Sequence, residues 1–362
     1  MVLTSLPVDE VSVVLVGYGH GGAVFHAPLV EATPGLRLAA VVTGNPARQA
    51  AVRARYPQAR VMADPAEVPA AAGDFGLGVV STPNRSHVEV ATALLRAGLP
   101  VVVDKPVAAR AGDATALSDL ASSLGLLAVP FHNRRWDGDF LTVCQLVRSG
   151  RLGALWRFES RFERWRPGPV RDVWREDPAP EAAGGLLYDL GAHLVDQLLV
   201  LCGPPKSVVA ELAMRRPGAR VDDDTFLSLT FPDGMVAQLW ASSCAAQTGP
   251  RFRLLGSEAA YVKYGLDGQE AALQAGMSPA GPAWGVEDEQ AWGQVGRDGD
   301  RVAVPTRPGA YPDFYAAVLA SLQGSAPAPV TMVEAIAGLQ IIEAARRSAT
   351  GGGMAVPAGV SS

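Results

Sequence analysis

The sequence of 362 residues predicts an α/β fold, in which a doubly wound parallel sheet is followed by an α+β domain with a large, open, mostly antiparallel sheet. Short apolar runs alternate with helical segments up to about residue 130, which is the pattern of parallel βαβ units. Beyond residue 131 the strand-like runs become longer, and two of them flank a tight turn, which favours antiparallel pairing. The length exceeds one ordinary hydrophobic core and indicates about two domains.

The domain boundaries follow from this change of pattern. We expect the parallel-sheet domain at 1–130 and the α+β domain at 131–350, where it provides substrate and oligomer contacts. The closing sequence GGGMAVPAGVSS, at 351–362, is rich in glycine and predicts a flexible tail.

The first domain contains five apolar runs with the length of buried strands. Ser86 and Glu89 have the spacing of a capping box, which predicts a helix that runs to about Ala97 and ends at Gly98. The predicted strands are 11–16, 36–42, 76–81, 100–103 and 126–130.

The second domain begins with a predicted helix at 139–149 and continues with strands. The sequence FPDG from Phe231 predicts a hairpin, because Asp233 and Gly234 supply the backbone angles of a tight turn. Residues 265–310 are rich in Gly, Pro and Ala and predict long connections. The predicted strands are 155–162, 225–231 and 235–242, and further helices are expected at 313–322 and 332–347.

Composition excludes several classes of protein. The net charge is −5 and no basic run exceeds the short RFERWR sequence at Arg161, so no nucleic-acid or membrane partner is expected. No stretch approaches about 20 uninterrupted apolar residues. The three cysteines, Cys144, Cys202 and Cys244, form no CxxC pair, which argues against a bound metal or a disulfide framework. We therefore expect a soluble cytoplasmic protein.

A glycine-rich loop follows the first predicted strand. Gly17, Gly19 and Gly22 form a GxGxxG motif where a strand turns into a helix, the position at which Rossmann folds bind the pyrophosphate of a dinucleotide. An acidic residue after the second strand is typical of NAD sites. This chain has Thr43 and Asn45 there, followed by Arg48 at a position that suits a 2′-phosphate, which favours NADP while NAD stays possible.

Lys105 follows the strand predicted at 100–103, inside the sequence VVVDKPVAAR. Ligands of open α/β sheets bind at the carboxyl ends of the strands, so this lysine is expected beside the nicotinamide. Burial there lowers a lysine pKa, as a proton acceptor at neutral pH requires. The alternative is an ordinary ion pair with Asp104.

The segment GGLLYDLGAHLVDQ from Gly184 predicts a helix that presents polar groups together. At helical spacing Asp189, His193 and Asp196 lie on one face beside an apolar stripe. A carboxylate and an imidazole at one helix start suit proton transfer, although a solvated polar stripe with one satisfied histidine has the same pattern.

The three motifs together resemble those of the Gfo/Idh/MocA oxidoreductases, over nearly the whole chain. FHAPL, STPNRSH, HNRRWDGDF and YDLGAHLVDQ further resemble the branch that contains NADP-dependent scyllo-inositol dehydrogenase. The resemblance implies that Lys105, Asp189 and His193 are catalytic, and that the protein forms a homodimer or homotetramer. It also adds His20, Ser81, Thr82 and Asn84 to the cofactor-binding candidates.

The function expected from this resemblance is hydride transfer between NAD(P) and a secondary alcohol or ketone of a cyclic polyol or sugar. Either His193 or Lys105 takes the hydroxyl proton, and Asp189 binds substrate and orients the imidazole. Asn133, Arg134 and Asp137 are substrate-binding candidates, because polar groups paired with substrate hydroxyls give selectivity. The alternatives are a non-catalytic NADP sensor, since the family includes a transcriptional repressor, and an oxidoreductase for a non-sugar substrate.

Overall fold

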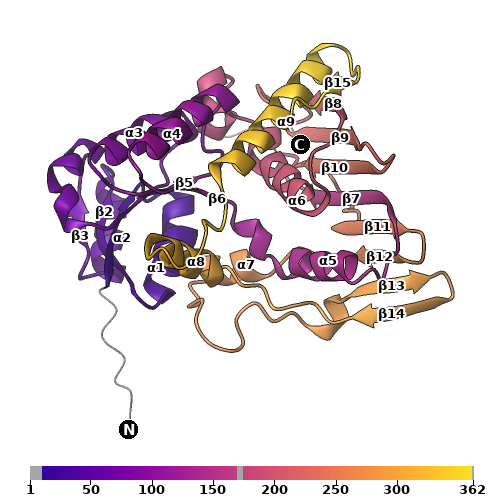
Figure 1. The fold of residues 1–362 in the computed structure, drawn as a ribbon, viewed down its shortest axis with the longest axis horizontal. Coiled ribbons are helices and arrows are strands. Elements are labelled where there is room, and N and C mark those ends of the chain that lie inside the picture. The colour runs from indigo at the N-terminus through magenta and orange to yellow at the C-terminus, as the bar shows by residue number, and fades with distance from the viewer. Residues whose placement is uncertain (1–9, 169–173, 361–362) are drawn as a thin grey trace, which may run out of the picture.

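The computed structural model describes residues 10–168 and 174–360, which form two sheets side by side (Figure 1). The first sheet is parallel and has the order β3-β2-β1-β4-β5-β6. Its strands are β1 (Val11–Val16), β2 (Leu36–Val42), β3 (Arg60–Met62), β4 (Leu77–Val80), β5 (Val101–Asp104) and β6 (Ala128–Phe131). The chain therefore reverses its strand order between β1 and β4, where a crevice forms at the carboxyl ends.

Helices cover both faces of this parallel sheet, as its uniformly apolar strands require. One face packs against α3 and α4, whereas α1 and the distant α8 pack on the other. Phe131 of β6 packs edge-on against Phe314 of α8 at 4.8 Å between ring centroids. A helix from the C-terminal part of the chain thus completes the cover of the parallel sheet. The helices are α1 (Ala27–Ala32), α2 (Pro46–Arg55), α3 (His87–Arg96), α4 (Ala111–Ser123) and α8 (Pro312–Leu322).

The second sheet has the order β14-β13-β12-β11-β7-β10-β9-β8-β15 and is antiparallel except for the pair β7 and β10. One face is covered by α5, α6 and α9 (Figure 1). The strands are β7 (Leu155–Glu163), β8 (Ser207–Ala213), β9 (Asp224–Thr230), β10 (Val236–Ser242), β11 (Phe252–Gly256), β12 (Ala260–Lys263), β13 (Gly293–Arg297), β14 (Asp300–Val304) and β15 (Val356–Pro357). The helices are α5 (Gly138–Arg148), α6 (Ala192–Cys202), α7 (Gln269–Gln274) and α9 (Met332–Thr350).

Short irregular helices connect these elements. Two are π-helical turns, Gly21–His26 and Leu187–Gly191, and both precede an α-helix directly. The 3₁₀ turns are Pro65–Glu67, Pro69–Asp74, Asn84–Ser86, Asn133–Trp136, Trp174–Glu176, Pro180–Ala182 and Glu289–Ala291.

The predicted fold class is confirmed, and the differences lie in local elements. The capping box at Ser86 is wrong: its hydroxyl donates to Thr82 Oγ1 and to the Pro83 carbonyl, and makes no cap bond to α3. The connection predicted at 265–310 contains α7, β13 and β14, because pairing along a sheet edge supplies the order that a glycine-rich sequence lacks. β15 lies within the predicted flexible tail, where Val356 pairs with Val208 of β8.

One helical stretch, Pro180–Cys202, has the length and apolar composition of a membrane span, with a mean hydropathy of 1.3 in its most apolar window. Of that window, 61% is buried inside the fold. The stretch contains α6, which packs between the second sheet and α9, so its apolar character is that of a core helix.

Candidate functional site

The glycine loop after β1 is shaped by close backbone contacts. Gly17 has φ +103°, and a Cβ there would lie 2.3 Å from the Ser81 carbonyl oxygen. A Cβ on Gly22 would lie 2.1 Å from the Gly17 carbonyl oxygen. Gly19, by contrast, has no heavy atom within 4 Å of its Cβ position and faces open space. Two glycines are therefore required by the fold, while Gly19 leaves room for a ligand to approach the backbone.

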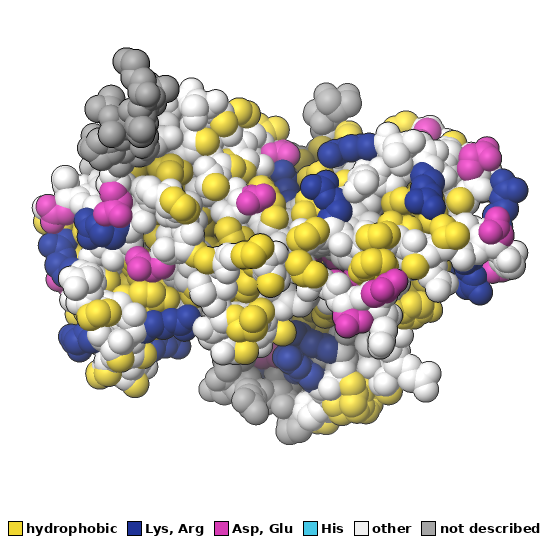
Figure 2. All heavy atoms as spheres, turned by 90° about the horizontal axis from the view of Figure 1, so that it is seen from below, with side chains coloured by type: hydrophobic (Ala, Val, Ile, Leu, Met, Phe, Trp, Pro, Cys, Tyr) yellow, Lys and Arg dark blue, Asp and Glu magenta, His cyan; other side chains and the backbone are white. Residues whose placement is uncertain are grey.

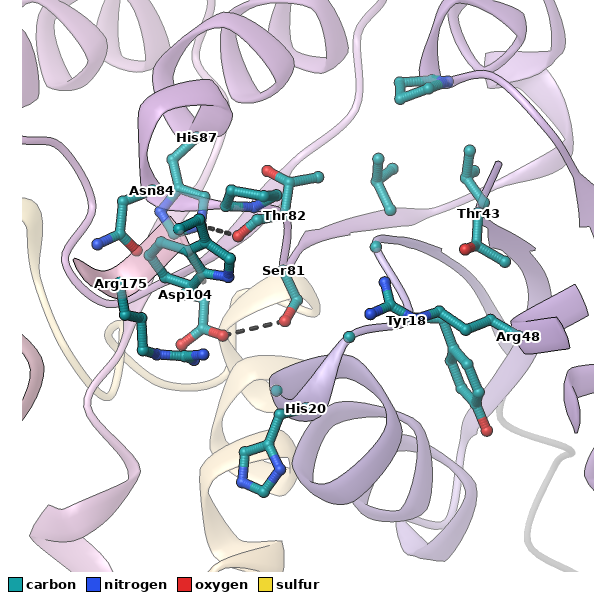
Figure 3. A pocket seen from close by; sticks show the side chains of 18 of the residues that line it. Tyr18, His20, Thr43, Arg48, Ser81, Thr82, Asn84, His87, Asp104 and Arg175 are labelled. Carbon is teal, nitrogen blue, oxygen red and sulfur yellow. Dashed lines mark hydrogen bonds between the residues drawn. The ribbon is translucent and has the colours of Figure 1, made fainter. Parts of the chain in front are cut away.

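A cavity of about 490 Å³ opens over this loop (Figure 3). Two predicted cofactor residues, Gly22 and Asn45, do not line the cavity. Gly22 lies beneath the loop, and the side chain of Asn45 accepts a hydrogen bond from the Arg48 amide at 3.1 Å. The other predicted cofactor residues all line it: Gly17, Gly19, His20, Thr43, Arg48, Ser81, Thr82, Asn84 and Lys105.

The cavity has two chemically different ends. Thr43 and Arg48 lie at one end, and Asn84, Asp104 and Arg175 lie at the other (Figure 3). Among the described residues that line the cavity, the carboxylates are those of Asp104 and Asp189. Figure 3 shows Asp104 remote from Arg48, and Asp189 lies 3.8 Å from Arg175 at the same end as Asp104. The end near Arg48 can therefore accept a phosphate without repulsion.

Lys105 bridges the two domains through Asp189. Its Nζ donates to Asp189 Oδ1 at 2.9 Å and to the Asp189 backbone oxygen at 2.6 Å. Burial raises the pKa of Asp189, but the charges of Lys105 and Arg175 act against it, and the net shift is downward. Asp189 is thus an ionised carboxylate at neutral pH, held against the ammonium group.

Asp104 does not form the ion pair that was the alternative for Lys105. Its Oδ1 accepts from the Lys105 backbone amide at 2.8 Å, and its Oδ2 accepts from Ser81 Oγ at 3.0 Å. Burial raises the pKa of Asp104. The nearby His26, at 3.5 Å, and His87 lower the pKa by more than burial raises it, so the net shift is downward and the carboxylate stays charged. A Cβ on Gly21 would lie 2.6 Å from both Asp104 Oδ2 and Ser81 Oγ. Asp104 therefore fixes the backbone that carries Lys105.

His193 lies one turn beyond Asp189 and is 6% exposed. Its Nδ1 is buried without a hydrogen-bond partner, and its ring lies 6.4 Å from that of Phe162 between centroids. Burial, and then the charge of Lys105, hold the pKa of His193 well below its usual value. The imidazole is therefore neutral at pH 7. His193 does not line the cavity, and its catalytic role stays a prediction. The expected orienting contact from Asp189 is not seen, because that carboxylate is bound to Lys105.

The segment from Gly184 departs from the regular helix that its spacing predicts. Leu187–Gly191 forms a π-helical turn, and α6 begins only at Ala192, so the angles of a regular helical wheel do not apply. Gly185 has φ +95°, and its Cβ would lie 2.2 Å from Asp222 Oδ1. Asp196 accepts two hydrogen bonds from Arg135, at 2.9 and 2.7 Å, so its carboxylate is used in a structural ion pair.

The predicted substrate residues Asn133, Arg134 and Asp137 are buried near the site and do not line the cavity. Asp137 Oδ1 accepts from the Tyr311 hydroxyl at 2.7 Å, and Arg134 donates to Glu270. Their role in substrate binding stays a prediction.

Several residues at the cavity have no signal in the sequence. Arg175 lines it, although it belongs to a 3₁₀ turn in a segment without periodicity. Glu270 lies in the predicted connection, and its carboxylate is 3.8 Å from His20 of the glycine loop. The nearby His20 and the charge of Arg134 lower the pKa of Glu270 to about 2. Only three-dimensional proximity identifies these residues.

Both domains match known protein families. Residues 11–132 match the oxidoreductase family with an NAD-binding Rossmann fold, and residues 140–262 match the GFO/IDH/MocA C-terminal domain. The chain is 39% identical over 346 residues to the uncharacterized oxidoreductase YdgJ of Escherichia coli, covering 94% of this chain and 97% of YdgJ. It is 35% identical over 348 residues to scyllo-inositol 2-dehydrogenase (NADP(+)) IolW of Bacillus subtilis, covering 94% of each.

Solved structures agree over the full length. YvaA of Bacillus subtilis superposes with a TM-score of 0.90 at 34% identity, covering 98% of this chain and 99% of that chain. An oxidoreductase from Bacillus cereus superposes with a TM-score of 0.85 at 25% identity, covering 96% and 98%. The arrangement of the two domains is therefore common to these proteins.

Proposed function

Because the chain belongs to the Gfo/Idh/MocA family of oxidoreductases, we propose that it transfers a hydride between NADP and a secondary alcohol or ketone of a cyclic polyol or sugar. The observation that carries this proposal is the ion pair between Lys105 and Asp189 at one end of the cavity above the glycine loop. The contact brings a lysine of one domain and a carboxylate of the other together at the crevice, which supports their proposed part in proton transfer.

The cofactor preference rests on the opposite end of the cavity. Arg48 offers a positive charge, and Thr43 offers a hydroxyl where an NAD site has a carboxylate. The similar IolW is named as an NADP(+) enzyme. These observations favour NADP as the cofactor.

Lys105 and His193 divide the acid–base work in this proposal. The bound nicotinamide supplies the hydride acceptor. Lys105 donates a hydrogen bond to the substrate oxygen while Asp189 holds its ammonium group in position. His193 has a buried Nδ1 without a partner and a neutral ring, so we assign it the proton that the hydroxyl group releases. In the reverse direction the same groups protonate the alkoxide.

Assembly into a homodimer or homotetramer is part of the proposal. The face of the second sheet opposite its helices carries large exposed side chains, including Trp156 at 61% and Tyr264 at 60% exposure. On the face of the molecule that Figure 2 draws, basic and acidic side chains are interspersed with apolar ones. Covering the apolar side chains by a second copy would remove them from water.

A substrate screen tests the proposed function. Inositol isomers, aldoses and their keto forms are supplied with NADP or NAD in either redox state, and the absorbance of the reduced nicotinamide is followed. We expect turnover with NADP for at least one compound. Tight NADPH binding without turnover of any compound would instead favour a cofactor sensor.

A further inference from the structure

Arg164 lies directly after β7, on the side of the strand that faces the site. Alternate residues of β7 point to the helix-covered face, where Ser160 and Phe162 are buried at 0% and 3% exposure. Arg164 comes two residues beyond Phe162, whose ring neighbours that of His193. Its backbone is fixed, since its amide donates to the Ser242 carbonyl at 2.9 Å. By this alternation the side chain points to the helix-covered face; it does not line the cavity, but it lies close enough to Asp189 and Glu270 for their charges to act on it.

Within residues 10–168 and 174–360, the guanidinium group of Arg164 has no recorded hydrogen bond or ion pair. Its Nε is buried without a hydrogen bond, and no carboxylate in the described part of the chain lies within ion-pair distance of it. Burial and Arg166 lower the pKa of Arg164, whereas the charges of Asp189 and Glu270 raise it. Both carboxylates are already bound by closer cations, Asp189 by Lys105 and Glu270 by Arg134.

Arg175 adds a second cation near Asp189. It lies near Asp104 and Asn84 in Figure 3, with its Nε 3.8 Å from Asp189 Oδ1. Its guanidinium carbon lies 4.3 Å from the centroid of the Trp174 ring. The cations Lys105, Arg164 and Arg175 outnumber the carboxylates Asp104 and Asp189, so a net positive charge surrounds the space next to Asp189.

The cofactor does not account for this charge. The pyrophosphate is expected at the glycine loop near Gly19, and a 2′-phosphate at Arg48, which Figure 3 shows remote from Arg175. A neutral polyol would leave a partly buried guanidinium without a counter-charge, and this arrangement is costly. An anion would remove that cost, and a planar guanidinium suits carboxylate or phosphate oxygens.

We propose that the substrate carries an anionic group, a carboxylate or a phosphate ester, which Arg164 and Arg175 bind while the reacting carbinol carbon faces the nicotinamide. This inference rests on the proposed hydride transfer. The substrate class is then an acidic or phosphorylated sugar or polyol rather than its neutral parent.

The test compares matched substrates in matched variants. Neutral hexoses, the corresponding hexuronates and hexose phosphates are supplied to wild type, Arg164→Gln and Arg164→Lys, with Arg157→Gln as the control. Arg157 is an exposed arginine at the start of the same strand. NADPH binding, followed by fluorescence, verifies that each variant is folded.

We expect kcat/KM for an anionic member to exceed that of its neutral parent by roughly tenfold or more, since hydrogen bonds to charged groups have this strength. Arg164→Gln should abolish this preference, Arg164→Lys should retain part of it, and Arg157→Gln should keep it. The better of the two anionic series identifies carboxylate or phosphate. A preference for neutral sugars in wild type would overturn the inference, and so would a preference for anionic sugars that survives in Arg164→Gln.

Calorimetry separates this inference from the proposed function. The same acids and phosphates are titrated into the enzyme with NADPH bound. Binding that weakens roughly tenfold in Arg164→Gln supports the anion site even without turnover. Binding without turnover of any compound contradicts hydride transfer, whereas turnover of neutral sugars with no anion binding contradicts the anion site alone.

Discussion

Lys105 Nζ lies 2.9 Å from Asp189 Oδ1 and 2.6 Å from the backbone oxygen of the same residue, although 84 positions separate the two in sequence. Lys105 follows β5 of the parallel sheet, and Asp189 belongs to the π-helical turn before α6. The contact thus joins the two domains at the mouth of the cavity. The position of the lysine ammonium group therefore depends on a residue from the other domain.

Asp189→Asn should reduce kcat while leaving the cofactor site intact. The amide keeps the shape of the carboxylate but not its charge, so Lys105 loses the partner that positions it. We expect kcat to fall by roughly 100-fold, with the NADPH dissociation constant within about threefold of wild type. Steady-state kinetics and fluorescence titration measure the two effects, and Asp300→Asn, at an exposed position of β14, is the control. Unchanged kcat in Asp189→Asn would remove Asp189 from the mechanism.

Two glycines of the loop should respond differently to alanine. Gly22→Ala places a Cβ 2.1 Å from the Gly17 carbonyl oxygen, so the backbone must move. We expect its melting temperature to fall by about 5 °C or more. Gly19→Ala meets no atom within 4 Å and should melt like wild type, yet bind NADPH roughly tenfold more weakly because the methyl group enters the cavity. Equal loss of stability in both variants would contradict this division.

Cofactor preference should reverse when the end near Arg48 becomes acidic. Thr43→Asp with Arg48→Gln removes a cation and adds a carboxylate that suits the ribose hydroxyls of NAD. The ratio of the NADH and NADPH dissociation constants should shift toward NADH by roughly 100-fold. Arg53→Gln, an exposed arginine on the same helix, controls for loss of net charge. A double variant that still prefers NADPH would show that the 2′-phosphate binds elsewhere.

Stability should fall as the pH drops below about 6.5, the usual pKa of histidine. Burial lowers the pKa of His87, His132 and His193, so the unfolded chain takes up protons that the folded protein refuses. Their contribution is present above the unfolded pKa and is lost on acidification. Asp104 and Asp189 have lowered pKa values and act in a separate window, below the usual carboxylate range.

Urea unfolding at neutral pH and at about pH 5.5 measures this slope. His193→Gln should reduce the loss by about 1 kcal/mol, the effect of one group over one pH unit. A wild-type protein whose free energy of unfolding rises from neutral pH to about pH 5.5 would contradict the burial of neutral histidines.

Much of the fold was predictable because its local and global signals agree. β1 and β2 occupy the predicted ranges, and the turn at Gly234 joins β9 to β10 as expected. The short β3 was missed, since three residues carry no periodicity. β13 and β14 were missed because their order comes from the sheet edge. A sequence pattern cannot report partners that are distant in the chain.

The site was predictable where a residue is tied to a motif. Lys105 and Asp189 occupy the sheet edge and the helix start that their motifs indicate, and the structure adds that they bind each other. The π-helical turn was not predictable, because its spacing resembles that of an α-helix over a few residues. Arg164 directly follows β7 and Arg175 lies in a 3₁₀ turn, so only their positions in space connect them with the reaction.

The most direct test of the account is the rate of NADP reduction by the best substrate from the screen, measured in wild type and in Lys105→Ala. Lys206→Ala, which removes an exposed lysine remote from the cavity, is the control. We expect Lys105→Ala to lose at least about 100-fold in kcat while it binds NADPH normally, and Lys206→Ala to keep the wild-type rate. Near-normal turnover in Lys105→Ala would contradict the assignment of this cavity as the reaction site.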